Sequence, residues 1–222
     1  MSTPPRFLKK EAISFGWRTV TGNLWFFVLL AIIVLAIGFI PQLLGRIGKE
    51  VYAFVPLIAL ALWVLQIFVQ LGIVKIALKF CDGGVGTIPD LFSQGRLFFR
   101  YLGASILYGL VVGVGFLLLI VPGIVWGIKF GLFSYVLVDK NLGVVASLKE
   151  SARLTQGSKG NLFLLGLLLA LVNFVGVIAL GVGLFVTVPI TMIASAFAYR
   201  KLSVAVQSPA VPAENPSPVT PA

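Results

Sequence analysis

The chain alternates between long apolar runs and short segments that carry its charges. The longest run covers residues 160–199, forty consecutive positions without a formal charge, and it ends at Arg200 and Lys201. A transmembrane helix needs about 20 apolar residues, and Gly181 and Gly183 mark a turn near the middle of the run. The pattern therefore predicts a hairpin of two membrane-spanning helices in this stretch.

The charged segment before this run has the pattern of a helix that lies on the membrane surface. Within 144–156, Val145 and Leu148 share one face, and charged and polar side chains occupy the other. Residues 9–20 and 89–101 repeat the pattern, with aromatic and apolar side chains on one side and bases on the other. We therefore expect three amphipathic interfacial helices.

Each expected surface helix is followed by two apolar runs, which indicates a unit repeated three times. The units cover about residues 9–80, 89–138 and 144–201. The expected spans before the last hairpin are about 24–44, 51–75, 102–120 and, after a turn at Val121-Pro122-Gly123, a helix that ends near 138.

The predicted fold is an all-α integral membrane bundle over residues 1–202. It has six transmembrane helices arranged as three hairpins, each preceded by a cytoplasmic amphipathic interfacial helix. Residues 203–222 are rich in proline and small polar residues and predict a disordered tail.

Composition supports a membrane location. The chain has 222 residues, of which 59% are hydrophobic and 11% charged, whereas a soluble domain carries roughly 25% charged residues. Within a bilayer only helices and closed barrels satisfy their backbone hydrogen bonds, and the apolar runs here are continuous rather than alternating, which favours helices. The net charge of +10 would suggest nucleic acid for a soluble protein; here the bases flank the spans, so we expect anionic lipid headgroups as partners and no nucleic acid.

The distribution of the bases predicts an orientation. With the six spans above, fourteen of the seventeen Lys and Arg residues fall on the side of the termini, and Arg46 and Lys49 fall on the other. Positive charge marks the cytoplasmic side of a membrane protein. We therefore expect a multi-pass protein of the inner (cytoplasmic) membrane of a bacterium, with both termini and the surface helices in the cytoplasm.

A block in the second half of the chain resembles a known family. It comprises Tyr135–Asp139, Ala146, Leu148, Ser151, Arg153-Leu-Thr155 and Gly157. The block is similar to one in bacterial six-helix membrane proteins of unassigned function, and in the membrane domain of some glycerophosphodiester phosphodiesterases. The resemblance extends over about 91–202 and implies a six-helix fold. It implies no activity, because this sequence holds no counterpart of the soluble phosphodiesterase domain.

The residue types needed for catalysis are scarce. The chain has no histidine, one cysteine (Cys81) and seven acids spread along its length, whereas hydrolytic sites usually need histidine or clustered carboxylates. Asp82 and Asp90 share one connector, where a weak cation site is an alternative. We predict that the protein is not an enzyme and holds no metal or cofactor.

Lys129 is the sharpest candidate for a functional residue, since it is the one charge deep in an expected span. A lysine at mid-membrane costs at least about 2.5 kcal/mol without water or a partner. Either it extends toward the interface, which would be structural, or it faces the bundle interior and binds an anion such as a lipid phosphate. Gln66, Gln70 and Asn173 are candidates for the same polar interior; the alternative for these amides is hydrogen bonding between helices.

Two series of glycines spaced by four predict close helix packing, with a hinge as the alternative. They are Gly109 and Gly113, and Gly123, Gly127 and Gly131.

Two functions remain open from the sequence. The first is a non-enzymatic scaffold that engages lipids or a partner membrane protein, with the surface helices either seating the bundle or contributing to function. The alternative is a transporter or permeation path for a small anionic or lipid-like solute, centred on Lys129.

Overall fold

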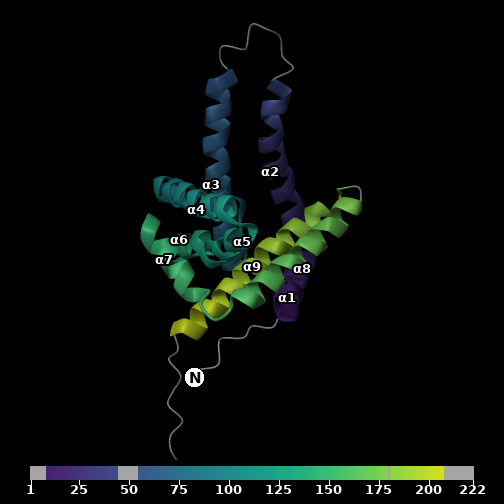
Figure 1. The fold of residues 1–222 in the computed structure, drawn as a ribbon. Helices are drawn as coiled ribbons and strands as arrows, with labels where there is room; N and C mark the ends of the chain where they lie inside the picture. The colour runs from purple at the N-terminus through teal and green to yellow at the C-terminus, as the bar shows by residue number, and fades with distance from the viewer. Residues whose placement is uncertain (1–8, 45–54, 180, 208–222) are drawn as a thin grey trace, which may run out of the picture.

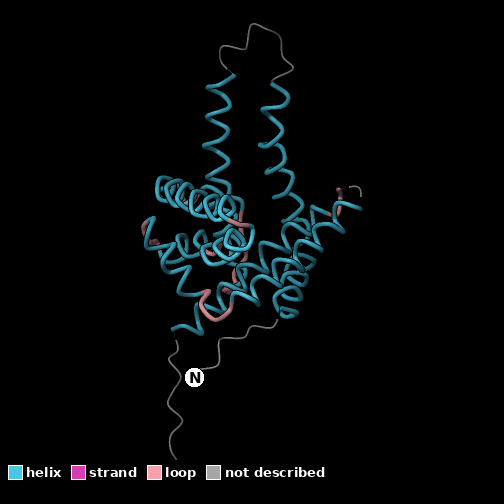
Figure 2. The backbone as a smooth tube through the Cα atoms, viewed as in Figure 1, coloured by secondary structure: helices cyan, strands magenta, loops and turns pink. Residues whose placement is uncertain are grey.

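The computed structural model describes residues 9–44, 55–179 and 181–207, and its regular elements there are all helical (Figures 1 and 2). The α-helices are α1 (Lys9–Gly22), α2 (Leu24–Leu44), α3 (Val55–Cys81), α4 (Phe98–Leu118), α5 (Ile120–Phe130), α6 (Phe133–Lys140), α7 (Val144–Leu154), α8 (Lys159–Ile178) and α9 (Leu184–Gln207). Two 3-10 turns, η2 (Ile88–Phe92) and η3 (Gly95–Leu97), connect α3 to α4. The predicted all-helical class is confirmed for the described residues.

Several helices have the length and composition of membrane spans. Four stretches pass this test by themselves: Pro56–Cys81, Ile88–Leu118, Ile120–Lys140 and Lys159–Ile178. A fifth is added if α1 and α2, which meet at an angle of 91°, count as one broken span. The described part of the chain therefore carries four to five candidate spans, which is compatible with a membrane protein.

The predicted turn at Val121-Pro122-Gly123 is wrong by a few residues. The backbone turns at Leu119, which is extended, and α5 begins at Ile120 so that Pro122 lies in its first turn. The first amides of a helix have no intrahelical acceptor, so a proline there sacrifices no hydrogen bond. The expected single helix that ends near 138 is also divided, into α5 and α6, at Gly131 and Leu132.

The predicted surface helix over 89–101 is not a continuous helix. Its first half forms η2 and η3, and α4 begins at Phe98. The backbone of Leu91 lies directly against Gly72 of α3, where a methyl group would overlap Leu91. Asp90 accepts hydrogen bonds from the main chain and hydroxyl of Thr87, both at 2.8 Å. This tight turn fastens the segment to α3 and leaves no room for an independent helix.

The other two predicted surface segments do form helices, α1 and α7. The buried face of α1 consists of Ala12, Gly16 and Val20, and Gly16 approaches the main chain of Ile190 in α9. Trp17 is 55% exposed. Small side chains thus face the protein and the tryptophan faces outward.

Helix α9 lies at the centre of the packing and contacts α1, α2, α3, α7 and α8. Its fully buried residues include Ile193, Tyr199 and Leu202, which join Leu71 of α3 and Leu137 of α6 in one core. The helix continues through Gln207. The predicted disordered tail therefore does not begin at residue 203, and residues 208–222 lie outside the described part of the chain.

Large apolar side chains cover much of the outer surface. The turn between α4 and α5 exposes a continuous apolar run, in which Leu117 is 87% exposed and its neighbours through Val121 are also exposed. Helices α2 and α3 project from the rest of the bundle (Figure 1), and their outer parts expose Phe39, Leu57 and Trp63. Soluble proteins rarely expose apolar area on this scale, whereas hydrocarbon accommodates it.

Candidate functional site

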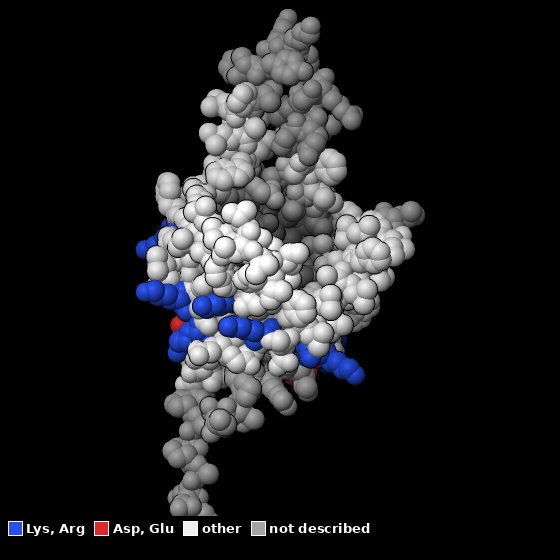
Figure 3. Space-filling view, viewed as in Figure 1, with Lys and Arg blue, Asp and Glu red and all other residues white. Residues whose placement is uncertain are grey.

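Lys and Arg side chains gather in a band across one face of the molecule (Figure 3). Above the band, the described surface visible in this view carries no charged side chain. This separation of a charged band from an uncharged body is the pattern expected where headgroups meet hydrocarbon. The candidate residues are best placed relative to this band.

Lys129 lies in the last turn of α5 and borders a polar pocket of about 400 Å³. The pocket is lined by Lys129, Lys149, Ala152, Arg153, Gln156 and Lys159. Lys129 is half-buried, with its ammonium 5.1 Å from the centre of the Phe130 ring. The residue therefore shares its surroundings with bases from α7 and from the start of α8.

Two buried hydroxyls hold α7 against the end of α5. Ser151 and Thr155 each donate a hydrogen bond to the main-chain oxygen of Lys129, both at 3.1 Å. The amide of Leu132 in turn donates to Ser151 Oγ at 3.2 Å. These bonds satisfy backbone groups at the break between α5 and α6, which has no helical partners for them. The hydroxyls of Ser151 and Thr155 thus build the frame around Lys129.

Glu150 lies beside this pocket and is shared by two bases. Its carboxylate accepts hydrogen bonds from Arg153 Nε and Nη2, both at 2.7 Å, and from Lys140 Nζ at 2.7 Å. Hydrogen bonds from Arg153 and Lys140 outweigh burial and lower the pKa of Glu150 to about 2. Its negative charge is therefore already matched, and among the described residues no ion pair joins Lys129, Lys149 or Lys159 to a carboxylate.

The other predicted polar residues do not join Lys129. Gln66 and Gln70 line a separate groove between α3 and α4, with a volume of about 480 Å³, together with Tyr101 and Ser105. Asn173 donates a hydrogen bond to Thr191 Oγ1 at 2.9 Å, which connects α8 to α9. The four candidates therefore lie in three separate places, and no common polar interior joins them among the described residues.

The glycines that were predicted to pack closely differ in how near their neighbours come. An added methyl group at Gly109 or Gly113 would meet open space, and one at Gly127 would make an ordinary contact with Tyr108. At Gly123 it would overlap the ring of Phe116, and at Gly131 it would lie 2.7 Å from the Gly127 main-chain oxygen. The close approach of α4 and α5 runs through Gly123 and Gly115, the second of which the spacing pattern did not include.

An ion network that sequence reasoning missed joins the C-terminal ends of α3 and α6 to Arg200 in α9. Arg200 binds Asp82 at 2.6 Å and Asp139 at 2.8 Å. Tyr199 donates a hydrogen bond to the second oxygen of Asp139 at 2.6 Å. The sequence did hold one signal for this network. Asp82, Asp139 and Arg200 each lie near the C-terminal end of one of the three predicted units.

The same contacts bear on the alternative cation site at Asp82 and Asp90. Asp90 binds Lys79 at 2.9 Å, whereas Asp82 binds Arg200. Within the described ranges, no group of three His, Cys, Asp or Glu side chains is placed to hold a metal ion. The acids therefore join helices and loops to one another.

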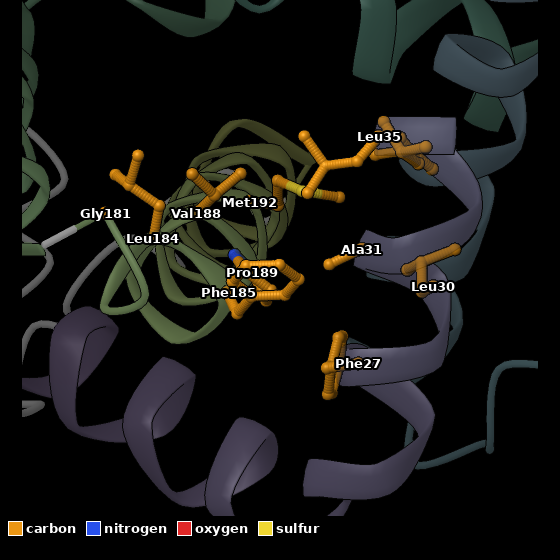
Figure 4. Close-up of a pocket in the computed structure, with 12 residues that line it drawn as sticks. Phe27, Leu30, Ala31, Leu35, Gly181, Leu184, Phe185, Val188, Pro189 and Met192 are labelled. Carbon is orange, nitrogen blue, oxygen red and sulfur yellow. The ribbon is translucent and has the colours of Figure 1, made fainter. Parts of the chain in front are cut away.

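A further cavity, lined by apolar residues, lies between α2 and α9 (Figure 4). Its volume is about 260 Å³, and Phe27, Leu35 and Met192 are among its lining residues. The residues that border it are apolar throughout, so its chemistry suits hydrocarbon rather than a charged solute.

Comparison with known proteins adds distant relatives. An uncharacterized protein of Mycobacterium bovis and uncharacterized proteins of two strains of Mycobacterium tuberculosis are each 27% identical to the chain over 148 residues. The match covers 65% of this chain and 44% of each relative. No protein-family model matches the chain, and no solved structure matches it significantly. The resemblance to the phosphodiesterase membrane domains therefore stays a prediction.

Proposed function

We propose that the protein is a non-enzymatic membrane scaffold that engages anionic lipid headgroups. It would also hold a partner membrane protein, either by direct contact or through these lipids. The band of bases that borders an uncharged apolar surface carries this proposal (Figure 3). Each base near such a surface adds about 1 kcal/mol of attraction to an anionic leaflet. The scaffold needs no catalytic group, in keeping with acids that are engaged in ion pairs at helix ends.

The proposal includes six spans, with the basic band and both termini on the cytoplasmic side of the inner membrane. By length alone, α2 with 21 residues and α9 with 24 also reach the roughly 20 residues that a span requires, and α9 carries its two charges, Arg200 and Lys201, toward its C-terminal end. Arg46 and Lys49, the bases expected on the opposite side, lie outside the described residues. In this arrangement α1 and α7 lie along the interface.

The alternative, a permeation path centred on Lys129, has weaker support. Lys129 borders a pocket formed with α7 and the start of α8, not with the amides of α3 and α8. A path would need polar groups that continue from this pocket across the bundle. The apolar cavity between α2 and α9 offers none.

Lipid dependence tests the proposed function. We expect the thermal unfolding midpoint of the protein to be higher in nanodiscs that contain anionic phosphatidylglycerol than in nanodiscs of neutral phosphatidylcholine. The difference is expected to shrink as salt is raised, because exposed charges are screened. Equal midpoints in both lipids at low salt would exclude engagement of anionic headgroups.

Accessibility tests the orientation. A Cys81→Ala background allows a single new cysteine to be placed at Lys49 or at Lys201. A membrane-impermeant thiol reagent applied to intact cells is expected to label the first and not the second. The reverse result would overturn the proposed topology while leaving the lipid test unaffected.

A further inference from the structure

The pocket beside Lys129 concentrates positive charge in one place. Lys129, Lys149 and Lys159 come from α5, α7 and the start of α8, and Arg153 of α7 also lines the pocket. The nearby carboxylate, Glu150, is engaged by Arg153 and Lys140. Clustered like charges repel one another and raise the local potential, which a bound anion would relieve.

We propose that this pocket binds a doubly charged phosphate group, the chemistry shared by a phosphomonoester lipid headgroup and by free inorganic phosphate. The proposal rests on the proposed function, because a headgroup can reach the pocket only if the basic band lies at the membrane surface. It goes further by assigning the site and the chemical class of its ligand.

The choice of phosphate follows from the donors. Three ammonium groups and the Gln156 amide border the pocket, and the Arg153 guanidinium beside them also binds Glu150. A terminal phosphate offers three strong acceptor oxygens and up to two negative charges. A carboxylate offers one charge and two oxygens, and would leave more of the bases unpaired. The pocket also lies where α8 begins, and the positive end of a helix dipole favours an anion.

The site is held by buried contacts. Ser151 and Thr155 are fully buried, and their hydrogen bonds to the Lys129 main chain set the position from which its side chain enters the pocket. Replacement of the Lys129 side chain leaves that main-chain oxygen in place. Lys129→Met therefore removes one charge from the pocket and preserves its frame.

The test measures binding to the purified protein in neutral detergent by native mass spectrometry and by thermal shift. The probes are short-chain phosphatidic acid, short-chain phosphatidylcholine and inorganic phosphate. The variants are Lys129→Met and the double variant Lys149→Met/Lys159→Met. The control is Lys10→Met, which removes an exposed lysine of α1 that does not line the pocket.

We expect wild type and Lys10→Met to bind phosphatidic acid in preference to phosphatidylcholine. Both pocket variants should lose roughly tenfold in affinity, which corresponds to about 1.4 kcal/mol. If wild type binds phosphatidic acid but not inorganic phosphate, the ligand is a lipid headgroup. If inorganic phosphate raises the thermal unfolding midpoint as much as phosphatidic acid does, the ligand is the free anion. The double variant alters exposed side chains, so it remains informative even if Lys129→Met folds poorly.

Two results would overturn the inference. One is that wild type binds neither phosphatidic acid nor inorganic phosphate, and the other is that the pocket variants bind both as tightly as Lys10→Met does. The experiments distinguish a wrong pocket assignment from a wrong proposed function. If phosphatidylglycerol nanodiscs stabilise wild type while the pocket variants bind phosphatidic acid and inorganic phosphate as tightly as Lys10→Met does, the scaffold proposal survives and the pocket assignment does not.

Discussion

Removal of one buried hydroxyl, that of Ser151, tests whether α7 is fastened to the end of α5 as the structure indicates. Ser151 Oγ donates to Lys129 O and accepts from the Leu132 amide. In a Ser151→Ala variant, Lys129 O keeps the bond from Thr155, but the buried Leu132 amide loses its acceptor. An unsatisfied buried amide costs about 1–3 kcal/mol, so we expect stability to fall by that amount.

The same helix supplies a matched control. Ser147 is also fully buried in α7, but its hydroxyl donates to Val144 O, one turn earlier in its own helix, at 2.8 Å. Ser147→Ala removes only this local bond and gains helix propensity of up to about 0.5 kcal/mol. We therefore expect Ser147→Ala to stay close to wild type.

Unfolding in mixed micelles with increasing sodium dodecyl sulfate, followed by tryptophan fluorescence and circular dichroism, measures both variants. The reasoning predicts a clear gap between Ser151→Ala and Ser147→Ala. If the two variants unfold together, the hydroxyl of Ser151 contributes no more than a local helical bond, and the proposed frame around Lys129 is refuted.

Three further changes test other parts of the structure. Gly72→Ala should lower the free energy of unfolding by about 1–3 kcal/mol, because the new methyl group meets the Leu91 backbone. The control, Gly109→Ala, has open space around it and should be neutral or stabilising. Equal unfolding curves for the two variants would contradict this packing. Arg200→Met should lower the free energy of unfolding by about 1–3 kcal/mol, because it leaves Asp82 and Asp139 without their shared partner. The control is Arg96→Met, which alters an exposed arginine. An equal loss of stability in both variants would argue against the network. Glu150 has a pKa lowered to about 2 from 4.5, so its contribution is complete above pH 4.5 and is lost as the pH falls toward 2; the stability difference between wild type and Glu150→Gln should shrink over that window, and a constant difference would show that the carboxylate charge is not responsible.

The scaffold and transport hypotheses differ in what they require of Lys129. A permeation path needs a polar route that continues across the bundle, whereas a headgroup site needs only a pocket at the basic face. The pocket beside Lys129 is shared with α7, and the amides expected to extend it lie elsewhere. This arrangement favours the headgroup site.

The pattern of apolar and charged residues was enough to predict the class of the protein. Apolar runs of membrane length require backbone groups to be satisfied within each segment, and helices achieve this locally. For this reason the sequence could predict a helix over 24–44, a pair of helices within 160–199 that turns near Gly181 and Gly183, and the expected surface segments that became α1 and α7. Local pattern could not predict the turn at Leu119 or the short 3-10 turns before α4, because these depend on contacts with other helices.

The grouping of polar residues was decided by tertiary structure. Sequence reasoning selected Lys129 because a charge in an apolar run is costly, and that argument needs no neighbours. It could not show that Lys149, Arg153 and Lys159 border the same pocket, nor that Arg200 joins Asp82 and Asp139, which lie 118 and 61 positions earlier in the chain. Charge pairing depends on distances of a few ångströms in space, and those distances are set only when the helices pack.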